Sequence, residues 1–190
     1  RYALGNWWSR NVEYNDLSAH ELIRNFERKM IPFSVMLYDH DWHVREYGDQ
    51  KNLKTGYTFN TKLFKNPKDM IEEFHKRGIR VGLVVNPTNG IYPMEQYYKQ
   101  AMDYLKAVPN SIIQFDPLNP KYLDVLFKMF LHPLESMGVD FFWNDSTGDM
   151  DITKLWALNH YMYLDSGKNS NKRPMILARG GVLAPHRYPV

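Results

Sequence analysis

The chain has 190 residues, of which 44% are hydrophobic, 24% are charged and 15% are aromatic, and its formal net charge at pH 7 is +3. The positive charge is spread out without a run of five like charges, and no apolar run reaches 18 residues, so neither a nucleic-acid-binding arm nor a membrane segment is predicted. Cysteine is absent, which excludes disulfides and cysteine-ligated metals and leaves the compartment open.

Short apolar runs without polar alternation recur along the chain, as in parallel strands that are covered on both faces. Polar segments with helical spacing of apolar residues separate them. The expected strands lie at 2–4, 33–38, 81–85, 139–143 and 175–178.

Helices are predicted between these strands from capping residues and from the spacing of apolar side chains. Ser18–Glu21 reads as a capping box, and Asn66 before Pro67 reads as an N-cap followed by proline in the first turn. The expected helices run from 18 to about 30, from 66 to 78, over 94–107, from 119 to 138 with a kink at Pro133, and over 151–164.

Strands that alternate with helices predict a parallel α/β sheet with right-handed crossovers. No G-x-G-x-x-G or Walker loop follows any strand, which disfavours an open nucleotide-binding sheet and indicates no cofactor. The other parallel architecture is a (β/α)8 TIM barrel, which needs eight strands and about 250 residues, and both architectures stay open at this point. If the chain is part of a barrel, it holds about the first five βα units, and the three missing strands must come from outside this sequence.

Acids, indoles, amides and one arginine gather after the predicted strands, whereas the opposite strand ends carry no such cluster. In α/β barrels the chemistry lies at the C-terminal ends of the strands. Indole faces stack on the apolar faces of sugars, and carboxylates and amides bind hydroxyls, so a carbohydrate site is expected on this side. The residues at these positions are Asn6–Arg10, Asp39–His43, Asn86–Asn89, Trp143–Asp145 and Arg179.

Some polar and aromatic residues near these strand ends have a simpler explanation. Asp149 or Asp151 can cap the fifth predicted helix. Trp7 and Trp8 point to opposite sides of an extended segment, so one of them is expected in the core. Asp145 lies directly on the strand end and is less suited to capping.

Two metal-dependent motifs are matched only in part. Asp39-His40-Asp41 resembles the D-x-D of magnesium-dependent phosphotransferases with an aspartate nucleophile, but those motifs usually continue with threonine where this chain has His43. A phosphatase is therefore the less favoured alternative. A calcium loop at 145–151 is disfavoured because its spacing does not match D-x-[DN]-x-[DN]-G, and no metal site is predicted.

Several segments match the pattern of one enzyme family in order and spacing over nearly the whole chain. LGNWWSR (4–10) is similar to an opening L-G-x-x-x-S-R strand, and IPF (31–33) with YDHDW (38–42) is similar to I-P-x-D followed by D-x-D/W. GVDFFWND (138–145) is similar to the G-V-D-x-x-W-x-D strand, and Arg179 with Arg187-Tyr188 is similar to an R-x7-R-[YW] loop. Together they resemble glycoside hydrolase family 31, the family of α-glucosidases and α-xylosidases.

This resemblance implies a (β/α)8 TIM barrel and a retaining α-glycosidase in which Asp145 is the catalytic nucleophile. Residues 1–190 would form a partial catalytic barrel domain with about the first five βα units, and the remaining strands and other domains would lie outside the chain. Asp39 and Arg179 would bind hydroxyls of the sugar, and Trp143 would line the same subsite. Arg179 would also help to keep Asp145 ionised, because a nearby cation favours the charged form of a carboxyl group. The resemblance implies no metal and no cofactor. The other expected substrate-binding residues are Asp41, Trp42, Trp8 and Asn86.

A retaining mechanism needs a second carboxyl group, which serves as acid/base about 5 Å from the nucleophile. The position of the family's acid/base is expected beyond Val190, and neither Asp149 nor Asp41 matches it. We therefore expect the full-length protein to act on an α-linked oligosaccharide or glycoside, with the remainder of its polypeptide completing the barrel. The 190 residues alone are expected to be poorly active.

The chain departs from the family pattern after the expected nucleophile. Ser146–Asp149 places an acid four residues after Asp145 instead of three, and Asn60 and Asn86 stand where aspartate is common. The sugar, the linkage and the choice between hydrolase and transglycosylase therefore stay open. A non-catalytic family member that binds carbohydrate is the main alternative.

Overall fold

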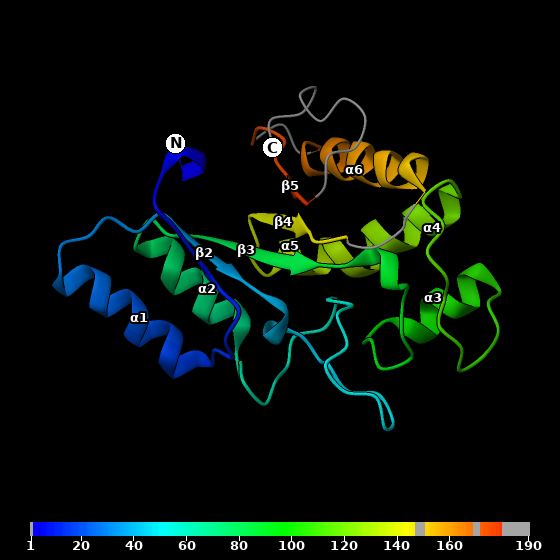
Figure 1. Cartoon of the computed structure of the whole chain (residues 1–190), viewed down its shortest axis with the longest axis horizontal. Helices are drawn as coiled ribbons and strands as arrows, with labels where there is room; N and C mark the ends of the chain where they lie inside the picture. Colours follow the sequence, from blue (N-terminus) through cyan, green and yellow to red (C-terminus); the bar gives the residue numbers. More distant parts are fainter. Residues whose placement is uncertain (1, 147–150, 169–171, 180–190) are drawn as a thin grey trace.

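The structure is a computed structural model of the chain, and it describes residues 2–146, 151–168 and 172–179. Five parallel strands form a curled half-barrel in which the order of the strands follows the chain (Figure 1). This arrangement confirms the predicted parallel α/β fold with five strands. The strands are β1 (Trp7–Arg10), β2 (Val35–Tyr38), β3 (Arg80–Val85), β4 (Phe141–Asn144) and β5 (Leu177–Ala178).

Helices connect the strands and cover the sheet, with α1 and α2 beside the first three strands and α6 beside β4 and β5 (Figure 1). None of the described helices is both long and apolar enough to cross a membrane. The helices are α1 (Asp16–Arg28), α2 (Pro67–Lys76), α3 (Tyr98–Leu105), α4 (Pro120–Asp124), a π-helical segment (Val125–Leu131), α5 (His132–Ser136) and α6 (Ile152–Ser166), and the short 3-10 helices are η1 (Tyr2–Leu4), η2 (His40–Trp42) and η3 (Pro87–Asn89).

Two predicted boundaries near the N-terminus were wrong. The run at 2–4 is the 3-10 helix η1 and not a strand, and Leu4 is 97% exposed because no element covers it. The strand begins at Trp7, where parallel pairing with Val35 of β2 becomes available. The N-cap of helix α1 is Asn15, three residues before the expected cap, and Ser18 is its partner in the capping box.

The helix expected over 119–138 is interrupted where the proline predicted an irregularity. Asn119 caps α4 by accepting a hydrogen bond from the backbone of Lys121, and Pro120 occupies the first turn, as expected. A π-helical segment then precedes Pro133. Proline has no N–H and its ring collides with the carbonyl four residues earlier, and a wider π turn accommodates both effects.

The two faces of the sheet pack differently because successive strand residues point to opposite sides. Met36 and Leu83 belong to the main core, together with side chains of α1 and α2. On the other face, Val35, Leu37 and Phe141 form a smaller cluster that faces the interior of the half-barrel.

Gly82 makes room for this interior cluster. It lies in register with Leu37 on one side and Phe141 on the other. A Cβ at this position would lie 2.5 Å from the Phe141 ring, well inside contact distance. The missing side chain therefore allows the phenylalanine ring to lie across β3.

Candidate active site

Asp145 lies at the C-terminal edge of the sheet, one residue beyond β4. Its backbone N–H donates to the carbonyl of Val85 at 2.9 Å, and the backbone N–H of Arg179 donates to the carbonyl of Asn144 at 3.0 Å. The sheet hydrogen bonds thus continue past the strand ends and fix both residues. Asp145 has the same strand parity as Trp143 and Phe141, which places its side chain on the interior face.

The carboxylate of Asp145 is buried, with 5% of the residue exposed, and its oxygens have different neighbours: Oδ2 has a hydrogen-bond partner, whereas Oδ1 has an ion-pair partner but no hydrogen bond among the described residues. Arg179 Nε lies 2.7 Å from Oδ1 in an ion pair. His40 Nε2 lies 3.2 Å from Oδ2. The Arg179 guanidinium also lies 5.6 Å from the centre of the Trp143 ring, within the range of a cation–π contact. Trp143, Asp145 and Arg179, all predicted site residues, therefore meet at one point.

Asp39 follows β2 and adjoins this group. Its carboxylate accepts a hydrogen bond from the backbone N–H of His40 at 2.7 Å and so caps η2. The same carboxylate lies 4.0 Å from His40 Nε2. His40 thus stands between the carboxylates of Asp39 and Asp145.

Asn86 follows β3, the strand next to β4 in the sheet. It is buried, with 3% of the residue exposed, and its side-chain oxygen accepts a hydrogen bond from the Thr88 hydroxyl. Its backbone N–H donates to the carbonyl of Thr55 at 3.0 Å. The predicted site residue Asn86 is therefore held at the same edge of the sheet as Asp145.

Two predicted substrate-binding tryptophans have structural partners of their own. Trp42 is 1% exposed and donates its indole N–H to the carbonyl of Val84 at 2.8 Å. Trp8 donates to the Tyr14 hydroxyl at 2.7 Å and packs edge-on against Phe26 of α1, on the helix-covered side of the sheet. Of the adjacent pair, Trp8 therefore packs against the main core and Trp7 against the interior cluster.

Asp41 is turned toward a different part of the surface. Its carboxylate forms an ion pair with Arg45, which also donates to the carbonyl of Leu53. Both side chains line a polar cavity of about 390 Å³ together with Glu13 and Lys62. Neither Asp145 nor Asp39 lines this cavity. The carboxylates of Asp39 and Asp41 therefore have different neighbours, although the two residues are only two positions apart.

A buried amide network behind Asp145 was missed by the sequence reasoning. Asn144 donates its side-chain amide to Asn159 of α6 at 2.7 Å and accepts a hydrogen bond from the Ser146 hydroxyl. All three residues are buried. The signal in the sequence was an asparagine next to an apolar residue, Leu158, in the predicted last helix, which does not reveal its partner.

The structure describes the chain up to Ser146 and again from Asp151 onward. Asp151 caps α6 by accepting a hydrogen bond from the backbone N–H of Thr153 at 2.8 Å, which confirms one of the two expected caps. Asp149, which is the acid four residues after Asp145, lies outside the described residues, and so do Arg187 and Tyr188.

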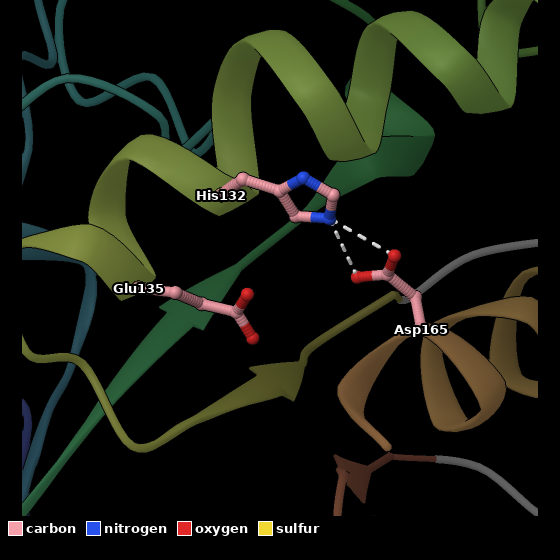
Figure 2. A group of neighbouring side chains, drawn as sticks. All are labelled: His132, Glu135 and Asp165. Atoms are coloured by element: carbon pink, nitrogen blue, oxygen red, sulfur yellow. Dashed lines mark hydrogen bonds and ion pairs between the residues drawn. The ribbon is translucent and has the colours of Figure 1, made fainter. Parts of the chain in front are cut away.

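His132, Glu135 and Asp165 form a second cluster of potential ligands away from Asp145 (Figure 2). Their ligating atoms lie within 4.8 Å of one another, and His132 Nε2 is 2.9 Å from Asp165 Oδ1. However, Lys168 forms ion pairs with both carboxylates, and Lys172 lies 3.6 Å from Glu135. The ammonium groups neutralise the acids, so the cluster favours an ion-pair network that joins α5 to α6 over a metal site.

Glu95 is the most strongly perturbed acid of the described residues. It is 3% exposed, and its two oxygens accept hydrogen bonds from Thr55 at 2.5 Å and Thr58 at 2.6 Å. Burial raises its pKa to about 7, although both hydroxyls oppose this shift. Glu95 thereby ties the segment before Asn60 to the turn that precedes α3.

Glu95→Gln should make the stability of the intact protein less dependent on pH. The native pKa of Glu95 lies above its ordinary value of 4.5, so the native form binds the proton more tightly and loses stability as pH rises from about 4.5 to about 7. Between pH 5 and pH 8 this loss amounts to about 2–3 kcal/mol. Denaturant unfolding of both proteins at these two pH values measures the difference.

Glu21→Gln on the exposed face of α1 is the control, and its unfolding free energy should follow the wild-type pH profile. If Glu95→Gln also follows the wild-type profile, Glu95 does not titrate in this range.

Comparison with known proteins identifies the family. Residues 1–190 match the family model described as the glycosyl hydrolases family 31 TIM-barrel domain. The chain belongs to glycoside hydrolase family 31. This result confirms the resemblance seen in the sequence and makes the five strands part of the family's TIM barrel.

Relatives of this family 31 chain are named for different activities. It is 26% identical over 212 residues to an α-xylosidase of Saccharolobus solfataricus, covering 99% of this chain and 28% of that protein. In fold it resembles a GH31 α-xylosidase from Xanthomonas citri, with a TM-score of 0.71, 16% identity, and coverage of 95% of this chain and 23% of the other.

A variant of a Flavobacterium johnsoniae GH31 dextranase complexed with isomaltotriose is similar as well. The TM-score is 0.76 at 17% identity, covering 98% of this chain and 26% of that one. The chain thus spans about a quarter of the length of these relatives. Membership of family 31 favours glycoside hydrolysis over the phosphatase alternative.

Proposed function

We propose that the protein containing this chain hydrolyses α-glycosidic bonds with retention of configuration and that Asp145 is its nucleophile. The observation that carries the proposal is the placement of Asp145 at the end of a barrel strand, where Arg179 holds one carboxylate oxygen and His40 holds the other. In barrels of this kind, residues at the C-terminal ends of the strands perform the chemistry. Family membership supports a glycosidase in general.

In the first step, the Asp145 carboxylate attacks the anomeric carbon and an acid group donates a proton to the departing oxygen. The product is a covalent glycosyl-enzyme ester. In the second step, the same acid group, now ionised, removes a proton from water, and the water displaces Asp145 from the sugar. We propose that this acid/base and the strands that complete the barrel belong to the part of the polypeptide outside these residues.

The neighbours of Asp145 receive matching roles. Arg179 stabilises the negative charge of the nucleophile and, with Asp39, binds hydroxyls of the sugar. Trp143 forms one wall of this subsite, and Asn86 offers an amide at the next strand end. Trp42 and Trp8 lie behind these residues and support the strands, because both indoles bond to protein groups.

The substrate class follows from the relatives only in outline. The similar proteins are named as α-xylosidases and a dextranase, so we propose an α-linked oligosaccharide or glycoside, with α-xylosides and α-glucosides as the first to test. No metal or cofactor enters the proposed reaction.

Covalent trapping tests the proposal directly. The intact protein is incubated with a panel of 5-fluoro-α-glycosyl fluorides, and the labelled residue is located by peptide mass spectrometry. We expect the label on Asp145, because the fluorine slows hydrolysis of the ester and lets it accumulate. The reactive sugar identifies the substrate class.

Asp145→Asn should lose the label, whereas the exposed acid variant Asp124→Asn should keep it. A label on another acid would assign the nucleophile to that residue. Glycan binding without a label or turnover would establish the non-catalytic alternative.

A further inference from the structure

His40 reaches the proposed nucleophile from a neighbouring part of the barrel. His40 follows β2, 105 residues before Asp145 in the chain, and 3% of its surface is exposed. Its Nε2 lies 3.2 Å from Asp145 Oδ2 and 4.0 Å from Asp39 Oδ1. One imidazole nitrogen therefore faces the carboxylates of two different strand ends.

The other ring nitrogen, Nδ1, indicates which nitrogen of the imidazole carries the proton. His40 Nδ1 is buried and has no hydrogen-bond partner in the described part of the chain. An ionised carboxylate can only accept a hydrogen bond, so the contact with Asp145 requires the proton on Nε2. The unpaired Nδ1 is then the acceptor nitrogen of a neutral ring.

The surroundings of His40 favour this neutral form. Burial lowers its pKa below the ordinary value, opposed by the hydrogen bond to Asp145 and the charge of Asp39, while Lys54 adds to the lowering. His43 packs edge-on against the ring at 5.9 Å, and burial lowers its own pKa to about 3, so it adds no charge near neutral pH.

We propose that His40 is a positioning residue for Asp145, which it holds through a neutral Nε2–H donor. The proposal rests on the nucleophilic role of Asp145 proposed above. With Arg179 on Oδ1 and His40 on Oδ2, the plane of the carboxylate is fixed from both sides. A neutral donor achieves this without a second positive charge beside the nucleophile.

This contact affects both steps of the double displacement. In the free enzyme, a hydrogen bond to the charged carboxylate favours its ionised form. In the second step, the bond from sugar to Asp145 breaks and its electron pair returns to the carboxylate. The same N–H stabilises the charge that develops there.

Two variants of His40 in the intact protein separate positioning from packing. His40→Leu keeps an apolar side chain and removes the donor, whereas His40→Gln offers an amide N–H at a similar reach. With the glycoside found by trapping, His40→Leu should lower kcat/KM roughly 10- to 100-fold, as for a lost hydrogen bond to a charged group. The acidic limb of its pH profile should move to higher pH, and His40→Gln should restore the limb.

A packing role would lower the folded fraction without moving the acidic limb. His20→Gln on α1 is the matched control and should leave the profile unchanged. An acidic limb of His40→Leu that coincides with wild type overturns the proposal. Absence of turnover and label in the wild type would instead contradict the proposed function.

Ring ¹⁵N spectra test the contact independently of activity and of the folding of His40→Leu. The His40 signals are assigned by their loss in His40→Gln. We expect the Nε2–H tautomer in the wild type and its redistribution in Asp145→Asn. The Nδ1–H tautomer in the wild type would overturn the proposal whether or not the enzyme is active.

Discussion

Asp145→Gly should lower the rate of glycoside hydrolysis by the intact protein by about 10⁴- to 10⁶-fold, as expected when a nucleophile is removed. The proposed first step needs a carboxylate at this position, and water held in its place is a far weaker nucleophile. The steady-state rate with an activated aryl α-glycoside measures the loss. Binding of the substrate should change much less, because Asp39, Trp143 and Arg179 remain in place.

The glycine variant also offers a stereochemical test. The Arg179 and His40 groups that face the carboxylate would border the space that Asp145 leaves, and they favour a small anion there. Azide bound in this space should attack the anomeric carbon from the side opposite the leaving group and give the β-glycosyl azide from an α-glycoside. Product analysis by NMR identifies the configuration at the anomeric carbon.

Asp124→Gly, on the exposed surface of the fourth helix, is the control and should hydrolyse the substrate at the wild-type rate without azide. Full activity of Asp145→Gly without azide would remove Asp145 from the mechanism. Rescue that yields an α-glycosyl azide would contradict a single displacement at this site.

Arg179→Met should lower kcat/KM by about 10²-fold, at the lower end for a charge pair, because Asp145 is buried but the side chain of Arg179 is 54% exposed. Asp145 is 5% exposed, and without the guanidinium its carboxylate would keep the contact with His40 but lose its ion-pair partner. Steady-state kinetics of the purified intact protein measure the effect. The loss should fall mainly on kcat if the arginine acts on the charge of the nucleophile.

Arg179→Lys should recover part of the activity. Lysine restores a positive charge but neither the planar guanidinium nor its stacking on Trp143. Arg24→Met, on the exposed face of α1, is the control and should behave as wild type. Wild-type kcat/KM in Arg179→Met would show that the ion pair plays no part in the reaction.

Local chemistry in the sequence was sufficient to predict most elements. Asn66-Pro67, Asn119-Pro120 and Asp151 cap helices where they were expected to, because a cap depends on residues within one turn. The first strand was misplaced at 2–4, since pairing with β2, and not local apolarity, determines where a strand begins. The alternation of strands and helices predicted the parallel sheet, because a crossover helix is needed between parallel neighbours.

The parallel arrangement of the strands also predicted which residues of the candidate site lie near one another. The carboxyl ends of parallel strands meet at one edge, so residues that follow different strands become neighbours whatever their distance along the chain. Trp143, Asp145 and Arg179 meet in this way, and Asp39 adjoins them through His40.

Strand ends assign a residue to an edge of the sheet, but they do not assign its partners. Trp8 packs on the helix-covered face and Asp41 pairs with Arg45, although both were expected to bind substrate at the C-terminal edge of the sheet. Conversely, His40 was found against Asp145 and Asn159 against Asn144 only in the structure. The amino-acid sequence thus determined the alternation of strands and helices and the edge that carries the acids, because both follow from local periodicity and from the residues that follow each strand. Packing between distant segments decided the direction of each side chain and its hydrogen-bond partner. This packing exists only in the tertiary structure.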